Sequence, residues 1–178
     1  MLIKIVAISS VVLLLFIAFL FIARGRSSTV YVERTVSAPV ERVWQVWNDP
    51  ESVKKWWGPK DYTAPVVTND LRVGGAYLLS MRSRTGEIVW NAGSYKEVVP
   101  NTRIVSTMSF SDENGKAIPG SDVRVPGKWP DEITVTVEFK EAAGKTTIAI
   151  TEVGIPLIMK FFGTLGWQQQ LDKFEALL

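Results

Sequence analysis

The stretch Trp56-Trp57-Gly58-Pro59 separates two kinds of sequence pattern, and their order restricts the fold. Before it, residues 30–37 alternate apolar and polar side chains, which is typical of a strand. Residues 39–48 then place Val40, Val43, Trp44 and Trp47 on one helical face. Residues 51–56 form a second short helical turn that leads into the Gly-Pro turn. One strand followed by two short helices is therefore predicted on the amino-terminal side.

The carboxyl-terminal side reads as successive strands joined by turns, beginning at about Thr63. Strands are predicted around 77–82, 87–99, 103–110, 133–139 and 146–152, because apolar and polar residues alternate in them. Gly93 inside the second of these predicts a bulge or bend. The Pro- and Gly-rich residues 117–131 predict a loop. Repeated hairpins without intervening helices indicate an antiparallel sheet.

From about Pro156 the pattern becomes helical again and continues to Leu178. Gly163 and Gly166 weaken helix propensity, so a break is expected there, with the well-formed helix at 167–178. The predicted class is α+β: a curved antiparallel sheet wrapped around a long C-terminal helix, with two short helices after the first strand.

Histidine and cysteine are both missing from the 178 residues. This composition excludes Ser-His-Asp and Cys-His catalysis, zinc sites built from Cys or His, thiol redox chemistry and disulfides. Neither a paired-carboxylate motif nor a phosphate-binding loop is present in the sequence. No cofactor, no metal site and no catalytic residue is therefore predicted.

The net charge of +2 is concentrated at the amino terminus. Lys4, Arg24 and Arg26 precede the first acidic residue, which leaves 17 of the 20 basic residues against all 18 acidic ones, a net charge of −1. A nearly neutral domain gives no electrostatic reason to expect nucleic acid as a partner.

The run from Ile5 to Ala23 contains 19 residues without a charge. A helix of this length spans about 28 Å at ~1.5 Å per residue, close to the thickness of a bilayer core. We interpret it as a single transmembrane anchor. A cleaved signal peptide and a buried core helix are the alternatives, but the run is long for the former and no A-x-A-like site follows it.

The predicted organisation is an anchor with a short linker at residues 1–29 and a domain at residues 30–178. Positive charge is similar on the two sides of the apolar run. Arg24 and Arg26 lie closest to it, so the positive-inside rule favours a cytoplasmic domain.

Several motifs occur in an order that resembles a known family. They are Ser37-Ala38-Pro39 with Val43-Trp44, Asp49-Pro50 before Trp56-Trp57-Gly58-Pro59, Leu71 to Gly75, Gly93 to Pro100, Arg103-Ile104-Val105 with Thr107, and Gly166-Trp167 with Leu171. The order resembles the SRPBCC (START/birch-allergen type) helix-grip fold. Within it, residues 30–178 are most similar to homologues of the C-terminal domain of the activator of heat-shock protein 90 ATPase. None of these motifs is a catalytic signature.

The resemblance implies that the concave face of the sheet and the last helix enclose an apolar cavity. Strand parity and position select ten residues as its lining. They are Trp57, Tyr77, Leu79, Met81, Trp90, Met108, Phe110, Trp167, Leu171 and Phe174. The alternative is that these side chains only fill the core. A one-residue error of parity at Trp90 would place it on the other face.

Four other residues are candidates for different roles. Trp129 in the Pro/Gly loop is the best candidate for an exposed aromatic that touches lipid headgroups or a partner. Some SRPBCC relatives are cyclases or dehydratases, and Glu152, Arg82 and Tyr95 are the polar residues to test for such chemistry. However, Glu152 is expected to face solvent, and Arg82 falls on the face opposite Met81.

The sequence thus favours a membrane-anchored, non-catalytic protein that binds a hydrophobic small molecule or lipid. The alternative is a co-chaperone-like or regulatory module that contacts a chaperone or another protein. An enzyme of the cyclase or dehydratase type is the third hypothesis.

Overall fold

The structure, a computed structural model, describes residues 25–178. The anchor predicted from Ile5 to Ala23 lies outside these residues. In the described part of the chain, no helix is both long and apolar enough to cross a membrane.

One antiparallel sheet forms the body of the domain, with the strand order β1-β7-β6-β5-β4-β3-β2. Its strands are β1 (Ser27–Val36), β2 (Val67–Asn69), β3 (Ala76–Arg82), β4 (Ile88–Val99), β5 (Arg103–Ser111), β6 (Ile133–Ala142) and β7 (Lys145–Pro156). The helices are α2 (Val40–Asn48), α3 (Pro50–Trp56) and α4 (Lys160–Glu175), with single 3-10 turns at Gly120–Asp122 and Leu157–Met159. The predicted antiparallel sheet and C-terminal helix are confirmed.

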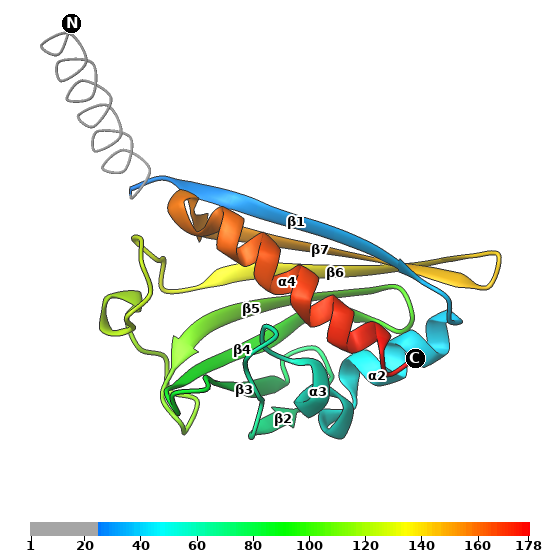
Figure 1. Ribbon diagram of the computed structural model, residues 1–178, viewed down its shortest axis with the longest axis horizontal. Coiled ribbons are helices and arrows are strands. Elements are labelled where there is room, and N and C mark those ends of the chain that lie inside the picture. Colours follow the sequence, from blue (N-terminus) through cyan, green and yellow to red (C-terminus); the bar gives the residue numbers. More distant parts are fainter. Residues whose placement is uncertain (1–24) are drawn as a thin grey trace, which may run out of the picture.

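Helix α4 lies diagonally across one face of the sheet, and α2 and α3 cover the end near the C-terminus (Figure 1). The sheet presents alternate residues to this helix, as the buried Val30 and Val32 of β1 and Ile148 and Ile150 of β7 show. The intervening Tyr31 is exposed. The alternation read from the sequence therefore separates the core face from the solvent face.

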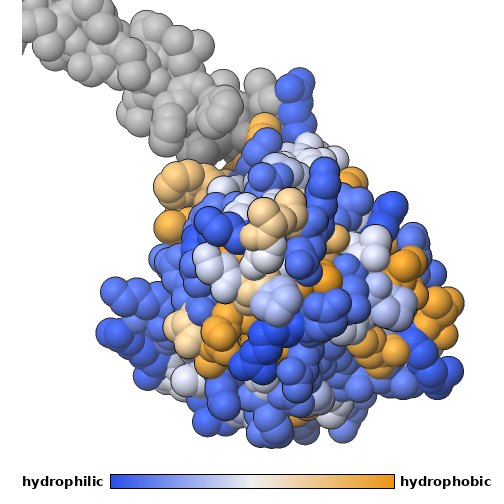
Figure 2. Space-filling view, turned by 90° about the vertical axis from the view of Figure 1, so that its right-hand side faces the viewer, coloured by the Kyte–Doolittle hydropathy of each residue, from blue (hydrophilic) through white to orange (hydrophobic). Residues whose placement is uncertain are grey.

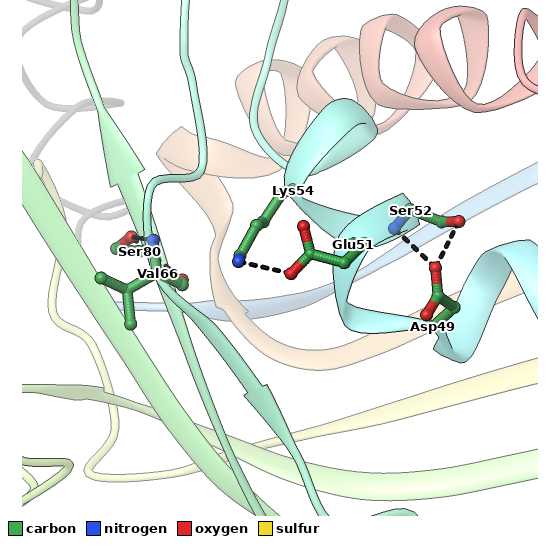
Figure 3. Close-up of polar contacts among 6 residues, drawn as sticks. All are labelled: Asp49, Glu51, Ser52, Lys54, Val66 and Ser80. Atoms are coloured by element: carbon green, nitrogen blue, oxygen red, sulfur yellow. Dashed lines mark hydrogen bonds and ion pairs between the residues drawn. The ribbon is translucent and has the colours of Figure 1, made fainter.

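Helix α3 begins at a cap that the sequence supplies locally (Figure 3). The Asp49 carboxylate accepts hydrogen bonds from the backbone N–H and the hydroxyl of Ser52, at 2.8 and 2.7 Å. Pro50 occupies the first turn, where its missing N–H leaves no hydrogen bond unmade. Nearby, the Ser80 hydroxyl accepts from Val66 N at 2.8 Å and so holds the segment that precedes β2.

The break predicted in the last helix is wrong, because α4 continues through both glycines and ends at Glu175. Tertiary packing explains the difference. A Cβ at Gly163 would lie 3.2 Å from the Val30 Cγ2 atom, so the glycine permits close approach of α4 to β1. Burial of the helix face offsets a propensity loss of about 1 kcal/mol per glycine.

The bulge or bend predicted at Gly93 lies a few residues later, since the register of β4 on β5 shifts between Tyr95 and Glu97. Gly93 instead makes room: a Cβ there would collide with the Thr107 carbonyl oxygen and lie 2.6 Å from the Tyr77 hydroxyl oxygen. The first strand after the Gly-Pro turn begins later than predicted, because Thr63 forms only an isolated bridge with Arg82 and regular pairing starts at Val67.

Candidate ligand-binding cavity

A cavity of about 460 Å³ lies between the amino-terminal half of α4, the sheet and two loops. The sheet wall comes from β3 to β7, and the loops are those that carry Pro59 and Trp129. Five of the ten predicted residues line it: Trp57, Met81, Met108, Phe110 and Trp167. Its volume is within the range of ~300–1,000 Å³ typical of small-molecule sites.

A smaller space of about 80 Å³ adjoins α3 and β2. Tyr77 and Leu79 line this space and not the larger cavity. The Tyr77 hydroxyl donates to the Thr107 carbonyl at 2.6 Å, and the Tyr95 hydroxyl donates to Asn69 Oδ1 at 2.6 Å. Burial raises the pKa of both phenols above the usual value. These two tyrosines are thus structural, and Tyr95 is not a candidate for proton transfer.

Trp90, Leu171 and Phe174 line neither space. Trp90 pairs with Ser80 and Ser111, whereas its neighbour Asn91 pairs with Leu79 and Phe110 and faces the cavity. The predicted parity of Trp90 was therefore wrong by one residue. Leu171 and Phe174 are fully buried in the core, and the Phe174 ring lies 5.5 Å from that of Trp47.

Glu152 is the principal cavity residue that the sequence interpretation missed. The expectation that it faces solvent is wrong, since only 5% of the residue is exposed and it lines the cavity. Burial raises the pKa of its carboxyl to about 7, and the side chain of Trp167 acts in the opposite direction. Alternation along β7 could have found it, because Ile148, Ile150 and Glu152 have the same parity.

Two residues of the cavity lining each carry a buried polar atom without a hydrogen-bond partner. They are the Trp57 indole Nε1, a donor, and the Asn91 amide Oδ1, an acceptor. Buried polar groups in proteins are almost always paired. Both atoms are inaccessible, so they add no polar contact to the surface of the mainly apolar cavity.

The wall formed by Trp57 to Tyr62 is held by the carboxyl-terminal half of α4. Gly58 has a φ of +90° and its N–H donates to Gln170 Oε1 at 2.9 Å. The Lys173 ammonium donates to the carbonyls of Trp57, Gly58 and Tyr62 at 3.4, 2.9 and 3.2 Å. Gly58 permits the left-handed turn, and the helix then fixes it, so Trp57 is oriented by backbone contacts.

The opposite rim of the cavity includes Trp129. This residue is half-buried, with its ring 5.0 Å from that of Phe110 in an edge contact and its Nε1 donating to Pro126 O at 3.1 Å. The prediction of an exposed aromatic at this position is wrong, because the Pro/Gly loop folds back onto the sheet.

The model of one protein family matches residues 37–178, and its description is Activator of Hsp90 ATPase homolog 1-like protein. The chain belongs to this family. No curated protein matches it.

Solved structures of similar proteins agree with the family assignment. A crystal structure of a protein from Chromobacterium violaceum is 31% identical, with a TM-score of 0.70, and the match covers 84% of this chain and 95% of that one. A protein from Mycobacterium smegmatis is 24% identical, with a TM-score of 0.71 and coverages of 86% and 96%. The crystal structure of the AHSA1 protein from Silicibacter pomeroyi is 19% identical, with a TM-score of 0.67 and coverages of 84% and 96%. The AHSA1-like domain therefore has the SRPBCC-type fold.

The chemistry available in this AHSA1-like cavity is limited. A carboxyl group with a pKa of about 7 can in principle transfer protons near neutrality. Arg82 is exposed and does not line the cavity, so it cannot assist Glu152 there. Across residues 25–178, no three Asp or Glu side chains gather in a way that would hold a metal ion. Glu152 is thus the one carboxyl group on the cavity lining.

Proposed function

We propose that this AHSA1-like protein binds a hydrophobic small molecule or lipid in the cavity beneath α4, without catalysing a reaction. The main support is the cavity itself, which has a volume of about 460 Å³, apolar and aromatic walls and few polar groups. Such a composition is typical of small-molecule sites. Tight filling by core side chains, the alternative reading of the sequence, does not account for this space.

We also propose that the run from Ile5 to Ala23 anchors the protein in a membrane, with the domain on the cytoplasmic side. Leu157, just before α4, donates its backbone N–H to the Arg26 carbonyl at 2.8 Å, so the linker enters next to the start of that helix. Phe161 and Phe162 are 70% and 60% exposed there, and Phe162 and Leu165 also line the cavity. The face at the α2 end is mostly hydrophilic, with hydrophobic residues in separate small groups (Figure 2). An apolar rim beside the anchor would let a lipid-soluble ligand enter from the bilayer.

The binding proposal is tested by closing the cavity. Gly166 lines it, and within 4 Å a Cβ there would meet only Pro59 Cγ, at 3.7 Å, so Gly166→Leu places a branched side chain in the cavity. Thr164→Leu is the matched control, because it adds an apolar side chain to the same helix at a position that does not line the cavity. The full chain, isolated from its host membranes in native lipid particles, would be analysed by native mass spectrometry. We expect a ligand adduct on the wild type and on Thr164→Leu but not on Gly166→Leu; no adduct on the wild type would contradict the proposal.

Sidedness is tested with one introduced cysteine, since the chain has none of its own. Thr85 is exposed in the turn between β3 and β4, so Thr85→Cys provides a single reactive thiol. A membrane-impermeant maleimide should label it in broken cells and leave it unlabelled in intact cells. Labelling in intact cells would place the domain on the outer side.

We propose as a second candidate a co-chaperone-like or regulatory module that contacts a protein partner. The observation that favours it is the family match over residues 37–178. A partner retained equally by the wild type and by Gly166→Leu would support this candidate, because its surface would be used and its cavity would not.

A further inference from the structure

Glu152 has a position that restricts the ligand more narrowly than the apolar walls do. It lies in the interior strand β7, where its cross-strand neighbours are the buried Val30 of β1 and Val135 of β6. With strands on both sides, its side chain cannot reach solvent around an edge of the sheet. The carboxyl group therefore faces the enclosed side, and what it meets depends on the contents of the cavity.

No basic side chain compensates this acid. The lining contains neither lysine nor arginine, and the influences on the pKa of Glu152 are burial and the side chain of Trp167. The Lys173 ammonium of α4 donates instead to the carbonyls of Trp57, Gly58 and Tyr62. An ionised carboxylate in such a place is unfavourable unless something donates hydrogen bonds to it.

The rest of the lining brings no second acidic or basic side chain of this kind. It includes the amides of Asn91 and Gln170 and the hydroxyl of Ser109, which can donate as well as accept hydrogen bonds. Glu152 is the one Asp, Glu, Lys or Arg side chain among the residues that line the cavity. A ligand head that donates hydrogen bonds therefore matches it, and an anionic head does not.

We infer, on the basis of the binding function proposed above, that the ligand is an amphiphile whose polar head is a hydrogen-bond donor, a hydroxyl or a protonated amine, held by Glu152. A free fatty acid or a phosphorylated head would bring a second negative charge to a buried carboxylate without a counter-charge. A pure hydrocarbon would fill the space between the apolar walls and give Glu152 no hydrogen-bond donor beyond the Trp167 side chain. Both classes are therefore bound more weakly than the donor class.

The test compares four ligands with one apolar body: 2-naphthylmethanol, 2-naphthylmethylamine, 2-naphthoate and 2-methylnaphthalene. Each is titrated by calorimetry into the full chain in phosphatidylcholine nanodiscs at about pH 8, where the Glu152 carboxyl is largely ionised. Gly166→Leu in identical nanodiscs provides the blank for partitioning into lipid. We expect the alcohol or the amine to bind about tenfold or more tightly than 2-naphthoate and 2-methylnaphthalene, since hydrogen bonds to a charged group are among the strong ones. Preference for the amine over the alcohol would show that Glu152 binds the head group as an ion pair.

Variants connect the selectivity to the residue. Glu152→Gln should reduce binding of the amine by about tenfold, and Glu152→Leu should make 2-methylnaphthalene the preferred ligand. Glu138→Gln removes the same charge from an exposed position of β6 and should change nothing. If 2-methylnaphthalene and 2-naphthoate bind as tightly as the other two, or if Glu152→Gln keeps the selectivity, the inference is wrong while the binding function stands. If none of the four binds above the blank, both are wrong.

Discussion

The two halves of α4 cross the same sheet but are held very differently. The carboxyl-terminal half buries Gln170, Leu171 and Phe174, and it is fixed by polar contacts on both flanks. On one flank Arg34 donates to Gln168, Asp172 and Glu175 at 2.8, 2.9 and 3.0 Å, and on the other Lys173 binds the loop that carries Gly58. The amino-terminal half exposes Phe161 and Phe162 and lies over the cavity. One helix thus combines a structural end with an end suited to ligand entry, and stability and binding should respond to different substitutions.

The largest effect is expected at the buried end. Phe174→Ala removes a fully buried ring that contacts Trp47 and Trp56, at centroid distances of 5.5 and 5.6 Å. The lost burial and the cavity left behind should lower the free energy of unfolding by about 3–5 kcal/mol. Urea denaturation followed by tryptophan fluorescence measures it. Phe161→Ala, at the exposed end, is the control and should change stability by less than ~0.5 kcal/mol. Equal effects of the two variants would contradict the claim that the two halves of α4 contribute differently to stability.

A second effect, of opposite sign, is expected at the cavity. The folded-state pKa of Glu152, about 7, lies above the ordinary carboxyl value, so the native state holds this proton more tightly than the unfolded chain does. Stability from this group is complete below about pH 4.5 and is lost as the pH rises through about 7. Glu152→Gln should therefore stabilise the protein by roughly 3 kcal/mol at about pH 8 and by little at about pH 4.

Unfolding of Glu152→Gln would be measured across this pH range, with Glu138→Gln as the exposed control. A stability difference that does not grow with pH would show that Glu152 is not an isolated buried acid. In that case, ionisation of a cavity residue would not destabilise the fold, and the cavity would not differ from the rest of the core in this respect.

The loop clamp should contribute less. Lys173→Met leaves the carbonyls of Gly58 and Tyr62 without their donor, which should lower the free energy of unfolding by about 1–3 kcal/mol. Hydrogen exchange at residues 58–62 should accelerate more than exchange in β6. Lys160→Met, at the exposed start of α4, is the matched control. Unchanged exchange in the loop would mean that Gln170 alone holds it.

The smallest effect is expected at the outer flank. Asp172→Asn removes the 2.9 Å ion pair with Arg34, in which the Asp172 side chain is 65% exposed. Exposed pairs contribute little, so we expect a loss below ~1 kcal/mol that shrinks further in about 1 M salt. A larger loss, or one that salt does not reduce, would show that Arg34 organises this end of the helix beyond simple pairing.

Much of the site could be predicted from the sequence where a local period decided the outcome. Met81, Met108 and Phe110 were placed on the cavity face by strand alternation, and Trp57 and Trp167 by their positions beside a turn and on the last helix. Trp90 was misplaced, and its neighbour Asn91 occupies the cavity face in its place, although β4 pairs with β3 without a register shift across Gly93. Leu171 and Phe174 have the right helical face but lie beyond the end of the cavity, in the core.

The sequence by itself determined the order of strands and helices, their antiparallel pairing and the apolar run from Ile5 to Ala23, because these depend on periods and compositions within short segments. Only the tertiary structure decided that α4 runs unbroken through Gly163 and Gly166, since contact with Val30 outweighs a local preference. It also decided that Glu152 is buried. Judged from its neighbours in the sequence alone, a carboxylate is expected at the surface. The environment of Glu152 is instead set by strands and a helix that are distant along the chain.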